Sequence, residues 1–315
     1  MKKITIAATI FAISLSGAVS ADAADLVRVG IPEASNYMFA VLDVGTGAHI
    51  FEKHNLTIEK TAFPGAGKLQ EAMTAGVIDL TVSGNTDMAL ILKGVPQKAV
   101  AVTAGPPVDM ALVVRADGDI TRAADLKGKI IGVTSPTSLT SWLALDLARR
   151  QGWGSDGVQR AYVGAMSSMV AALQVRNVDA IIGPLTGGLQ MEAAGQGHLI
   201  PAFGDMKVFI THMIYASDSV IKNNPATLRS FLQAWFETVT YMRANRDETI
   251  RLTMPATQLP PDLAAKIYEV ETPALSTTGR FDSQAVATLI QSYIDLGIVE
   301  TVPKDKILFT EEFLP

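Results

Sequence analysis

The residues of this sequence best suited to bind a ligand lie in short polar loops, each following an expected strand. Glycines in these loops let backbone N–H groups approach a bound molecule, and the helix N-terminus that follows favours negative charge. Apart from Lys68 the loops contain no lysine or arginine, so we expect dipoles and neutral hydrogen bonds to hold an anion. The candidate ligand-binding residues are Ser35, Asn36, Tyr37, Gly65, Ala66, Ser83, Asn85, Thr86, Ser135, Thr137, Ser138, Met166, Ser167, Gly183 and Thr186.

Several of these side chains also fit purely structural roles, and both interpretations stay open. Ser83, Ser138 and Ser167 either contact a ligand or cap helices. Tyr37 either stacks on a ligand or packs beneath its loop. Asn85 is the stronger candidate, because its amide can donate and accept at a strand-to-helix turn. We expect Asn85→Ala to weaken ligand binding by about 1–3 kcal/mol.

Catalytic, metal-binding and cofactor-binding patterns are missing from the sequence. The four histidines, His49, His54, His198 and His212, show no metal-ligand spacing, and there are no cysteines. Gly65-Ala66-Gly67 lacks the rest of a dinucleotide fingerprint, and neither a P-loop nor a nucleophile elbow occurs. We therefore expect no catalytic residue, no metal and no cofactor, with His212 an ordinary, partly buried histidine.

The elements that would position the loops alternate between strands and helices. We expect strands at 26–31, 56–63 and 78–82 with helices at 39–54 and 67–75, and about 100 residues later strands at 129–134, 158–163 and 179–182 with helices at 138–151 and 166–175. Alternation of this kind predicts right-handed βαβ crossovers and mainly parallel sheets. Asp79 and Asp179 occupy matching places, which predicts two lobes of related topology with both carboxylates far from the ligand.

Two segments are expected to connect these lobes as a hinge. One runs through Gly105-Pro106-Pro107, and the other is an apolar run at 208–216. The C-terminal third should be helical, with Trp235 in the core. We therefore expect a signal peptide at 1–23, a first lobe at 24–106 plus 214–315, and a second lobe at 107–213.

The N-terminus has the pattern of a cleaved signal peptide. Lys2 and Lys3 precede a short apolar stretch at 4–15, and small residues follow at two plausible cleavage sites. The absence of cysteine excludes a lipid-modified cysteine at the cleavage site, so we expect a soluble periplasmic protein. A formal net charge of −5 argues against nucleic acid or anionic lipid as partners.

The order of several segments resembles a known family. FEKHNLTIEKTAFPGAGKLQEAMTAGVIDL at 51–80, AADLKGKIIGV at 123–133, MVAALQVRNVDAI at 169–181 and a helix starting at Pro225 follow one another as in the nitrate/sulfonate/taurine-type periplasmic binding proteins. These share a fold with the NMT1/THI5-like group. The resemblance implies a two-lobed α/β clamp of type II-like architecture with two crossing hinge segments. It also implies an ABC permease as partner and a small anionic, zwitterionic or heteroaromatic ligand.

Two positions depart from the family's pattern. Gly183-Pro184 stands where an acidic residue often precedes proline, which removes a carboxylate that could pair with a ligand ammonium. Residues 135–138 read Ser-Pro-Thr-Ser where glycine is frequent. We expect a monomeric, non-enzymatic binding protein that closes its lobes on a sulfonate-, taurine- or nitrate-like solute and delivers it to the permease. The alternatives are a thiamine-precursor or heteroaromatic binding protein, an enzyme of the same fold, and a periplasmic sensor partner.

Overall fold

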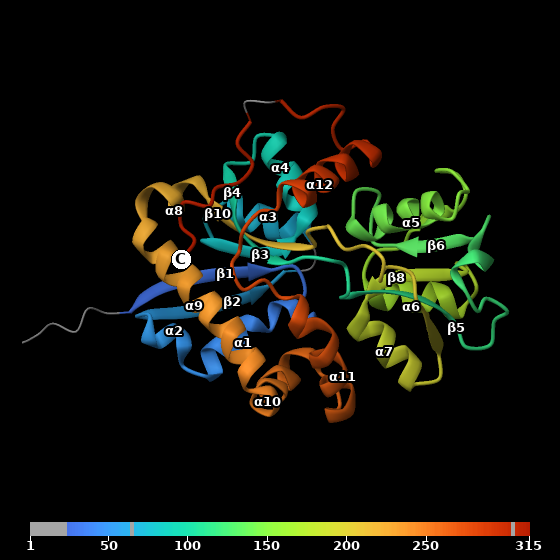
Figure 1. Cartoon of the computed structure of the whole chain (residues 1–315), viewed down its shortest axis with the longest axis horizontal. Coiled ribbons are helices and arrows are strands. Elements are labelled where there is room, and N and C mark those ends of the chain that lie inside the picture. The colour runs from blue at the N-terminus through green and yellow to red at the C-terminus, as the bar shows by residue number, and fades with distance from the viewer. Residues whose placement is uncertain (1–23, 64–65, 304–305) are drawn as a thin grey trace, which may run out of the picture.

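The computed structural model describes residues 24–63, 66–303 and 306–315, so the predicted signal peptide lies outside the described residues. Two five-stranded sheets, each flanked by helices, form two lobes that lie side by side (Figure 1). This confirms the expected α/β architecture. Within the described part of the chain, no helix is long and apolar enough to cross a membrane. The exact division of the chain at 106/107 and 213/214 remains our proposal.

The first lobe is built around a sheet with the strand order β2-β1-β3-β10-β4. Strands β1 and β3 are parallel, as are β1 and β2, while β10 runs antiparallel to both β3 and β4. Alternate β1 side chains, such as Val27 and Val29, are fully buried beneath the covering helices. The strands are β1 (Asp25–Ile31), β2 (Leu56–Ala62), β3 (Leu80–Gly84), β4 (Gln97–Ala104) and β10 (His212–Ser217).

The second lobe repeats this arrangement with the order β7-β6-β8-β5-β9. Each sheet contains one strand that runs antiparallel to its neighbours and directly follows a crossing between the lobes. In the second lobe this strand is β5, and in the first lobe it is β10. Only part of the apolar run at 208–216 is a strand, because β10 begins at His212. The strands are β5 (Met110–Arg115), β6 (Ile130–Val133), β7 (Gln159–Tyr162), β8 (Ala180–Pro184) and β9 (Gly197–Ile200).

The internal repeat is confirmed by two equivalent aspartates. Asp79 accepts a hydrogen bond from the backbone N–H of Arg28 at 2.9 Å, and Asp179 accepts one from Ile130 at 2.9 Å. Each aspartate thus connects the start of the third parallel strand of its lobe, β3 or β8, to the first parallel strand, β1 or β6. Both aspartates precede their strands and so lie at the edge of the sheet opposite the carboxyl ends, as the sequence indicated.

The helix expected at 39–54 is instead broken. The structure has a 3₁₀ turn η1 (Tyr37–Phe39), then α1 (Val41–Gly47) and a short α2 (Ile50–Lys53). The break falls at His49, whose φ of 57° lies in the left-handed region and so interrupts the helix. Asn55 has the same φ and ends this segment in the left-handed conformation that is typical of a helix C-cap.

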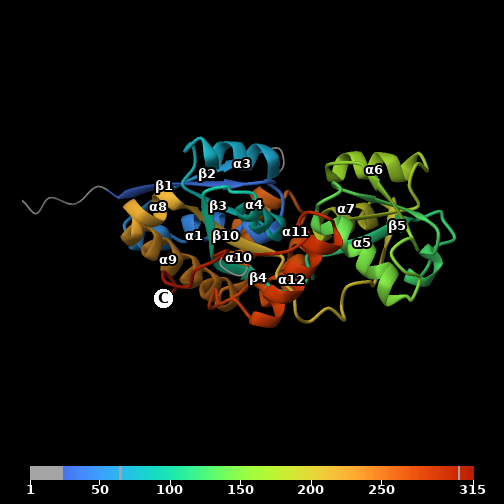
Figure 2. The same cartoon turned by 90° about the horizontal axis from the view of Figure 1, so that it is seen from above.

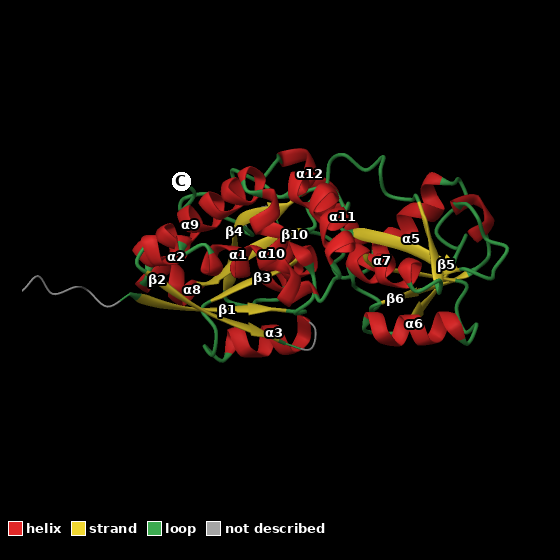
Figure 3. Cartoon of the chain, turned by 90° about the horizontal axis from the view of Figure 1, so that it is seen from below, coloured by secondary structure: helices red, strands yellow, loops and turns green. Residues whose placement is uncertain are grey.

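The remaining helices cover the faces of the two sheets (Figures 2 and 3). Trp235 is completely buried in the first lobe, which confirms its assignment to the core. The helices of the first lobe are α3 (Ala66–Thr74), α4 (Met88–Leu92), α8 (Asp218–Asn223), α9 (Pro225–Ala244), α10 (Arg246–Thr257), α11 (Pro261–Glu271) and α12 (Ser283–Asp295). Those of the second lobe are α5 (Leu139–Arg150), α6 (Met166–Gln174) and α7 (Leu185–Ala193).

Polar side chains connect the lobes outside the crossing segments. Lys266 on α11 lies 3.4 Å from Glu192 on α7. On the other side, the indole N–H of Trp142 on α5 donates to Asp295 at the end of α12 at 3.2 Å. Apolar packing joins the lobes as well, since Leu189 of α7 is buried in the same hydrophobic cluster as the core of the first lobe.

Candidate ligand-binding cleft

A cavity of about 630 Å³ lies between the lobes. The first lobe contributes the loop after β1 and the end of α10. The second lobe contributes the N-terminal end of α6, both ends of α7 and the residues just after α7. In a sheet of this type the carboxyl ends of the parallel strands meet at one edge, which explains why these loops converge. The lining residues are Glu33, Ser35, Ala165, Met166, Ser167, Val170, Pro184, Thr186, Gly187, Gln190, Met191, Ala194, Gln196 and Thr257.

Four of the residues predicted from sequence line this cavity together. Ser35 comes from the first lobe, while Met166, Ser167 and Thr186 come from the second. The cavity is therefore lined from both lobes, by Ser35 of the first and Thr186 of the second among others. A ligand that contacted both sides would hold the lobes together.

Met166 owes its position in the cavity to two glycines. A Cβ atom built on Gly183 would lie 2.7 Å from the Met166 sulfur, and one on Gly187 would lie 2.7 Å from its Cε. Gly183 therefore serves the site indirectly, by leaving room for the methionine. The thioether fills this space with a flexible apolar surface beside the polar ends of α6 and α7.

The N-terminus of α6 faces the cavity without a capping side chain. Ala165, Met166 and Ser167 all line the cavity. The N-cap residue is Ala165, whose methyl side chain cannot accept a hydrogen bond from the helix. The first N–H groups of a helix have no partner within the helix and carry partial positive charge. This end of the cavity is therefore suited to a negatively charged ligand group.

The opposite side of the cavity carries a carboxylate that the sequence analysis did not identify. Glu33 is the only charged side chain among the lining residues, and it accepts a hydrogen bond from the Ser35 hydroxyl at 3.1 Å. Burial raises the pKa of Glu33, and the bond from Ser35 partly opposes that effect. Its position two residues beyond β1, in the same loop as Ser35, was the signal that could have found it.

The Asn85 side chain is hydrogen-bonded to the hinge segment that returns to the first lobe. Its side chain is 2% exposed, and its amide N–H donates to the backbone carbonyl of Ile210 on the returning crossing at 2.8 Å. The carbonyl of Asn85 accepts from the hydroxyl of Tyr293. Neither Asn85 nor Thr86 lines the cavity, so their contact with a ligand stays a prediction.

Ser83 binds a buried aspartate. Its hydroxyl donates to Asp87 at 2.6 Å, and Gln70 donates to the same carboxylate oxygen at 2.9 Å. Burial raises the pKa of Asp87 to about 6. These three side chains form a polar network inside the first lobe, away from the cavity.

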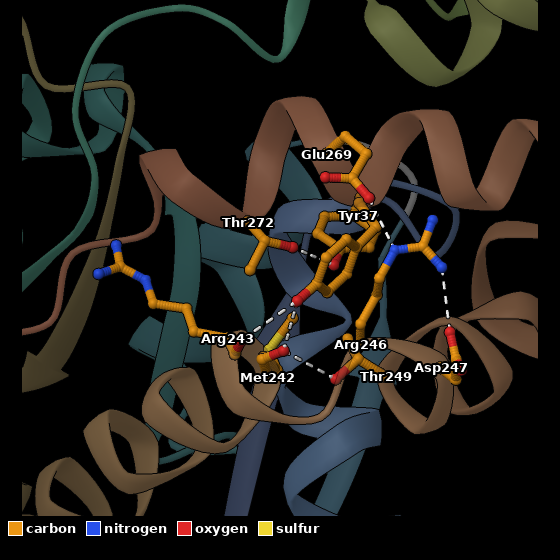
Figure 4. A network of polar contacts seen from close by, with 9 residues as sticks. Tyr37, Met242, Arg243, Arg246, Asp247, Thr249, Glu269 and Thr272 are labelled. Carbon is orange, nitrogen blue, oxygen red and sulfur yellow. Dashed lines mark hydrogen bonds and ion pairs between the residues drawn. The ribbon is translucent and has the colours of Figure 1, made fainter.

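Tyr37 packs beneath its loop, the structural role that the sequence left open. Its ring is 1% exposed and its hydroxyl shares a hydrogen bond of 2.6 Å with Thr272, as Figure 4 shows. Asn36 caps the same turn by accepting from the backbone N–H of Met38 at 2.9 Å. The loop after β1 is thereby fixed from below, which positions Glu33 and Ser35 at the cavity.

The loop after β6 has a capping role in the structure. Ser138 donates to the carbonyl of Ser135 at 2.8 Å and caps α5 by accepting from Ser141. Thr137 is exposed. None of these residues lines the cavity, whereas Gly65 lies outside the described residues and the side chain of Ala66 is not described.

Comparison with known proteins identifies a family model and a shared fold. The model described as NMT1/THI5-like matches residues 48–249. The sequence matches none of the curated proteins. Among solved structures, the alkanesulfonate-binding protein SsuA of Xanthomonas axonopodis pv. citri bound to MOPS has a TM-score of 0.74 and 16% identity, covering 90% of this chain and 96% of that one.

Two further structures are similar at the same level. The periplasmic aliphatic sulphonate-binding protein SsuA of Escherichia coli has a TM-score of 0.74 and 20% identity, covering 91% of this chain and 92% of that one. A mutant of DSZB in complex with biphenyl-2-sulfinic acid has a TM-score of 0.69 and 15% identity, covering 92% and 97%. Likeness at these identities establishes the two-lobed periplasmic-binding-protein fold.

Proposed function

Because the chain belongs to the NMT1/THI5-like family, we propose that it is a periplasmic substrate-binding protein that delivers a small zwitterionic organic solute to an ABC permease. The solute enters the cavity between the lobes, contacts both of them and stabilises the closed arrangement. The similar proteins that bind alkanesulfonates support this role. The protein acts as a monomer and reaches the periplasm through its cleaved signal peptide.

The charge distribution of the cavity favours a zwitterion over a simple anion. Glu33 offers a carboxylate on the first lobe, and the uncapped N-terminus of α6 offers partial positive charge on the second. An ammonium group beside Glu33 would lower the raised pKa of that carboxyl and keep it ionised. A sulfonate or carboxylate at the other end of the same molecule would accept from the N–H groups of α6. This assignment rests on one observation, the carboxylate of Glu33 among the residues that line the cavity.

The test compares two ligands that differ in one group. Taurine carries an ammonium where isethionate carries a hydroxyl, and titration calorimetry measures the dissociation constant of each. A charge-assisted hydrogen bond to Glu33 contributes about 1.5–3 kcal/mol, so taurine should bind roughly 10- to 150-fold more tightly. Glu33→Gln should remove most of that preference.

A matched variant and a second assay complete the test. Glu59→Gln changes an exposed glutamate on β2 of the same lobe and should leave both affinities unchanged. Equal binding of the two ligands by the unmodified protein would refute the zwitterion assignment while leaving a binding protein. Conversion of ligand to product would favour an enzyme of this fold, for which DSZB, described as a desulfurization enzyme, is the structural precedent.

A further inference from the structure

Three titratable side chains that the proposed binding mechanism does not use meet at the hinge. Asp109 lies on the segment that enters the second lobe, His212 begins the strand that returns to the first, and Glu271 ends α11 of the first lobe. Their exposed fractions are 1%, 4% and 1%. Nδ1 of His212 lies 3.6 Å from a carboxylate oxygen of Asp109, just beyond hydrogen-bonding distance.

Several polar atoms of this cluster are buried without a hydrogen-bond partner. Both carboxylate oxygens of Asp109, one of Glu271 and Nδ1 of His212 have no hydrogen-bond partner among the described residues. Burying ionised groups in this state is costly, so the neutral forms are favoured. Burial raises the pKa of Asp109 to about 7 and lowers that of His212 to about 4, while burial and the neighbouring Asp109 raise the pKa of Glu271.

The groups that face this cluster are few. Among the described residues, Tyr37 of η1 lies close enough to Glu271 for their charges to interact, and Tyr268 and Glu269 of α11 interact with Tyr37 as well. The Tyr37 hydroxyl is bound to Thr272, the residue after Glu271. Phe39 covers the imidazole of His212 edge-on, with ring centroids 5.2 Å apart. The first turn of α7, which packs here through the backbone, contains no acidic residue. No lysine or arginine is among the groups that shift the pKa of Asp109 or Glu271.

The position of the cluster couples its protonation to lobe movement. The carbonyl of Asp109 accepts from the N–H of Leu185 at 2.7 Å, which ties Asp109 to the start of α7 in the second lobe. His212 pairs with Gly84 in the sheet of the first lobe, and Glu271 ends α11, which packs on the core of that lobe. A rotation that moved Asp109 together with α7 would carry it away from His212 and Glu271 and would admit water to the cluster.

We propose that Asp109, His212 and Glu271 form a proton-dependent latch at the hinge. Protonated carboxyl groups favour the lobe arrangement described here, in which the cluster is sealed. Ionisation favours a wider separation, because a hydrated carboxylate is more stable than a buried one without a partner. The latch does not require the ligand assignment made above, and it can be measured on the ligand-free protein.

The experiment uses two probes on the ligand-free chain. Because the protein has no cysteine, Thr74→Cys on α3 and Ala171→Cys on α6 give a unique pair of labels. Both positions are exposed and their helices lie on the same face of the two lobes (Figure 2). The distance between fluorescent labels is measured by single-molecule energy transfer as the pH is raised from about 5.5 to 8.5.

We expect the population of molecules with separated lobes to grow as the pH is raised, with a midpoint near neutrality. If one proton is involved, the ratio of separated to sealed molecules should change by at most tenfold per pH unit. Asp109→Asn, which mimics the protonated side chain, should abolish the transition. Glu271→Gln provides a second variant if the first does not fold. Asp87→Asn removes a buried aspartate within the first lobe and should leave the transition intact. An unchanged distance across the pH range, or a transition that survives both hinge variants, would overturn the proposal.

Discussion

Replacing Asn85 with alanine should lower the stability of the protein more than it lowers ligand affinity. The side chain makes one buried hydrogen bond, to the carbonyl of Ile210, and its loss leaves that carbonyl without this donor. The desolvation cost of such a group is about 1–3 kcal/mol. The Asn85 Oδ1 atom is buried and has no partner among the described residues, so its removal recovers part of that cost. We therefore expect a loss of about 1–2 kcal/mol in the free energy of unfolding.

The assay is urea unfolding of the unmodified protein, Asn85→Ala and Asn85→Asp. The aspartate has the same size as asparagine but places a carboxylate oxygen against the Ile210 carbonyl. At neutral pH it should therefore lower the free energy of unfolding more than alanine does. In acid, where the carboxyl group is protonated and can donate, it should lower the free energy of unfolding less than alanine does. Calorimetry with the ligand follows in parallel. Unchanged stability together with a tenfold loss of affinity would refute this reasoning and return Asn85 to the ligand-binding residues, as first expected from the sequence.

Three further predictions test other parts of the structure. Tyr37→Phe removes a buried hydrogen bond and should lower the free energy of unfolding by about 1 kcal/mol without changing ligand affinity, measured by urea unfolding and calorimetry. Gly187→Ala should displace the flexible Met166 side chain and change ligand affinity several-fold, whereas Gly204→Ala, where a Cβ meets nothing within 4 Å, should not. Because burial raises the pKa of Asp87 to about 6, its contribution to stability is present below about pH 4 and is lost as the pH rises through about 6. Asp87→Asn should remove up to about 3 kcal/mol of that dependence, and an unchanged slope of stability against pH would contradict this.

The fold could be predicted because its determinants are local and repeated. Alternating apolar residues define β1, and aspartates at equivalent places begin the third parallel strand of each lobe. The break at His49 could not be predicted, because neither glycine nor asparagine stands there to indicate a left-handed residue. Its conformation is set by packing of α1 and α2 against the rest of the lobe.

The candidate site was only partly predictable for a related reason. The rule that ligands bind beyond the carboxyl ends of parallel strands located Ser35, Ser167 and Thr186, which do line the cavity. That rule does not distinguish a side chain that faces the cavity from one that caps a helix, as Ser138 does. Thr257 reaches the cavity from the end of α10, a placement that only the packing of the C-terminal helices determines.

The strand order has a consequence for how the chain acquires its structure as it emerges from its N-terminus. The second sheet is made from one continuous stretch, Met110 to Ile200, and can form as soon as that stretch is available. The first sheet cannot, since β10 lies between β3 and β4 and arrives more than 100 residues after them. A chain emerging from its N-terminus therefore carries an incomplete first lobe while the second is already assembled. Vectorial folding would begin in the middle of the sequence, and the N-terminal lobe would be the last to close its core.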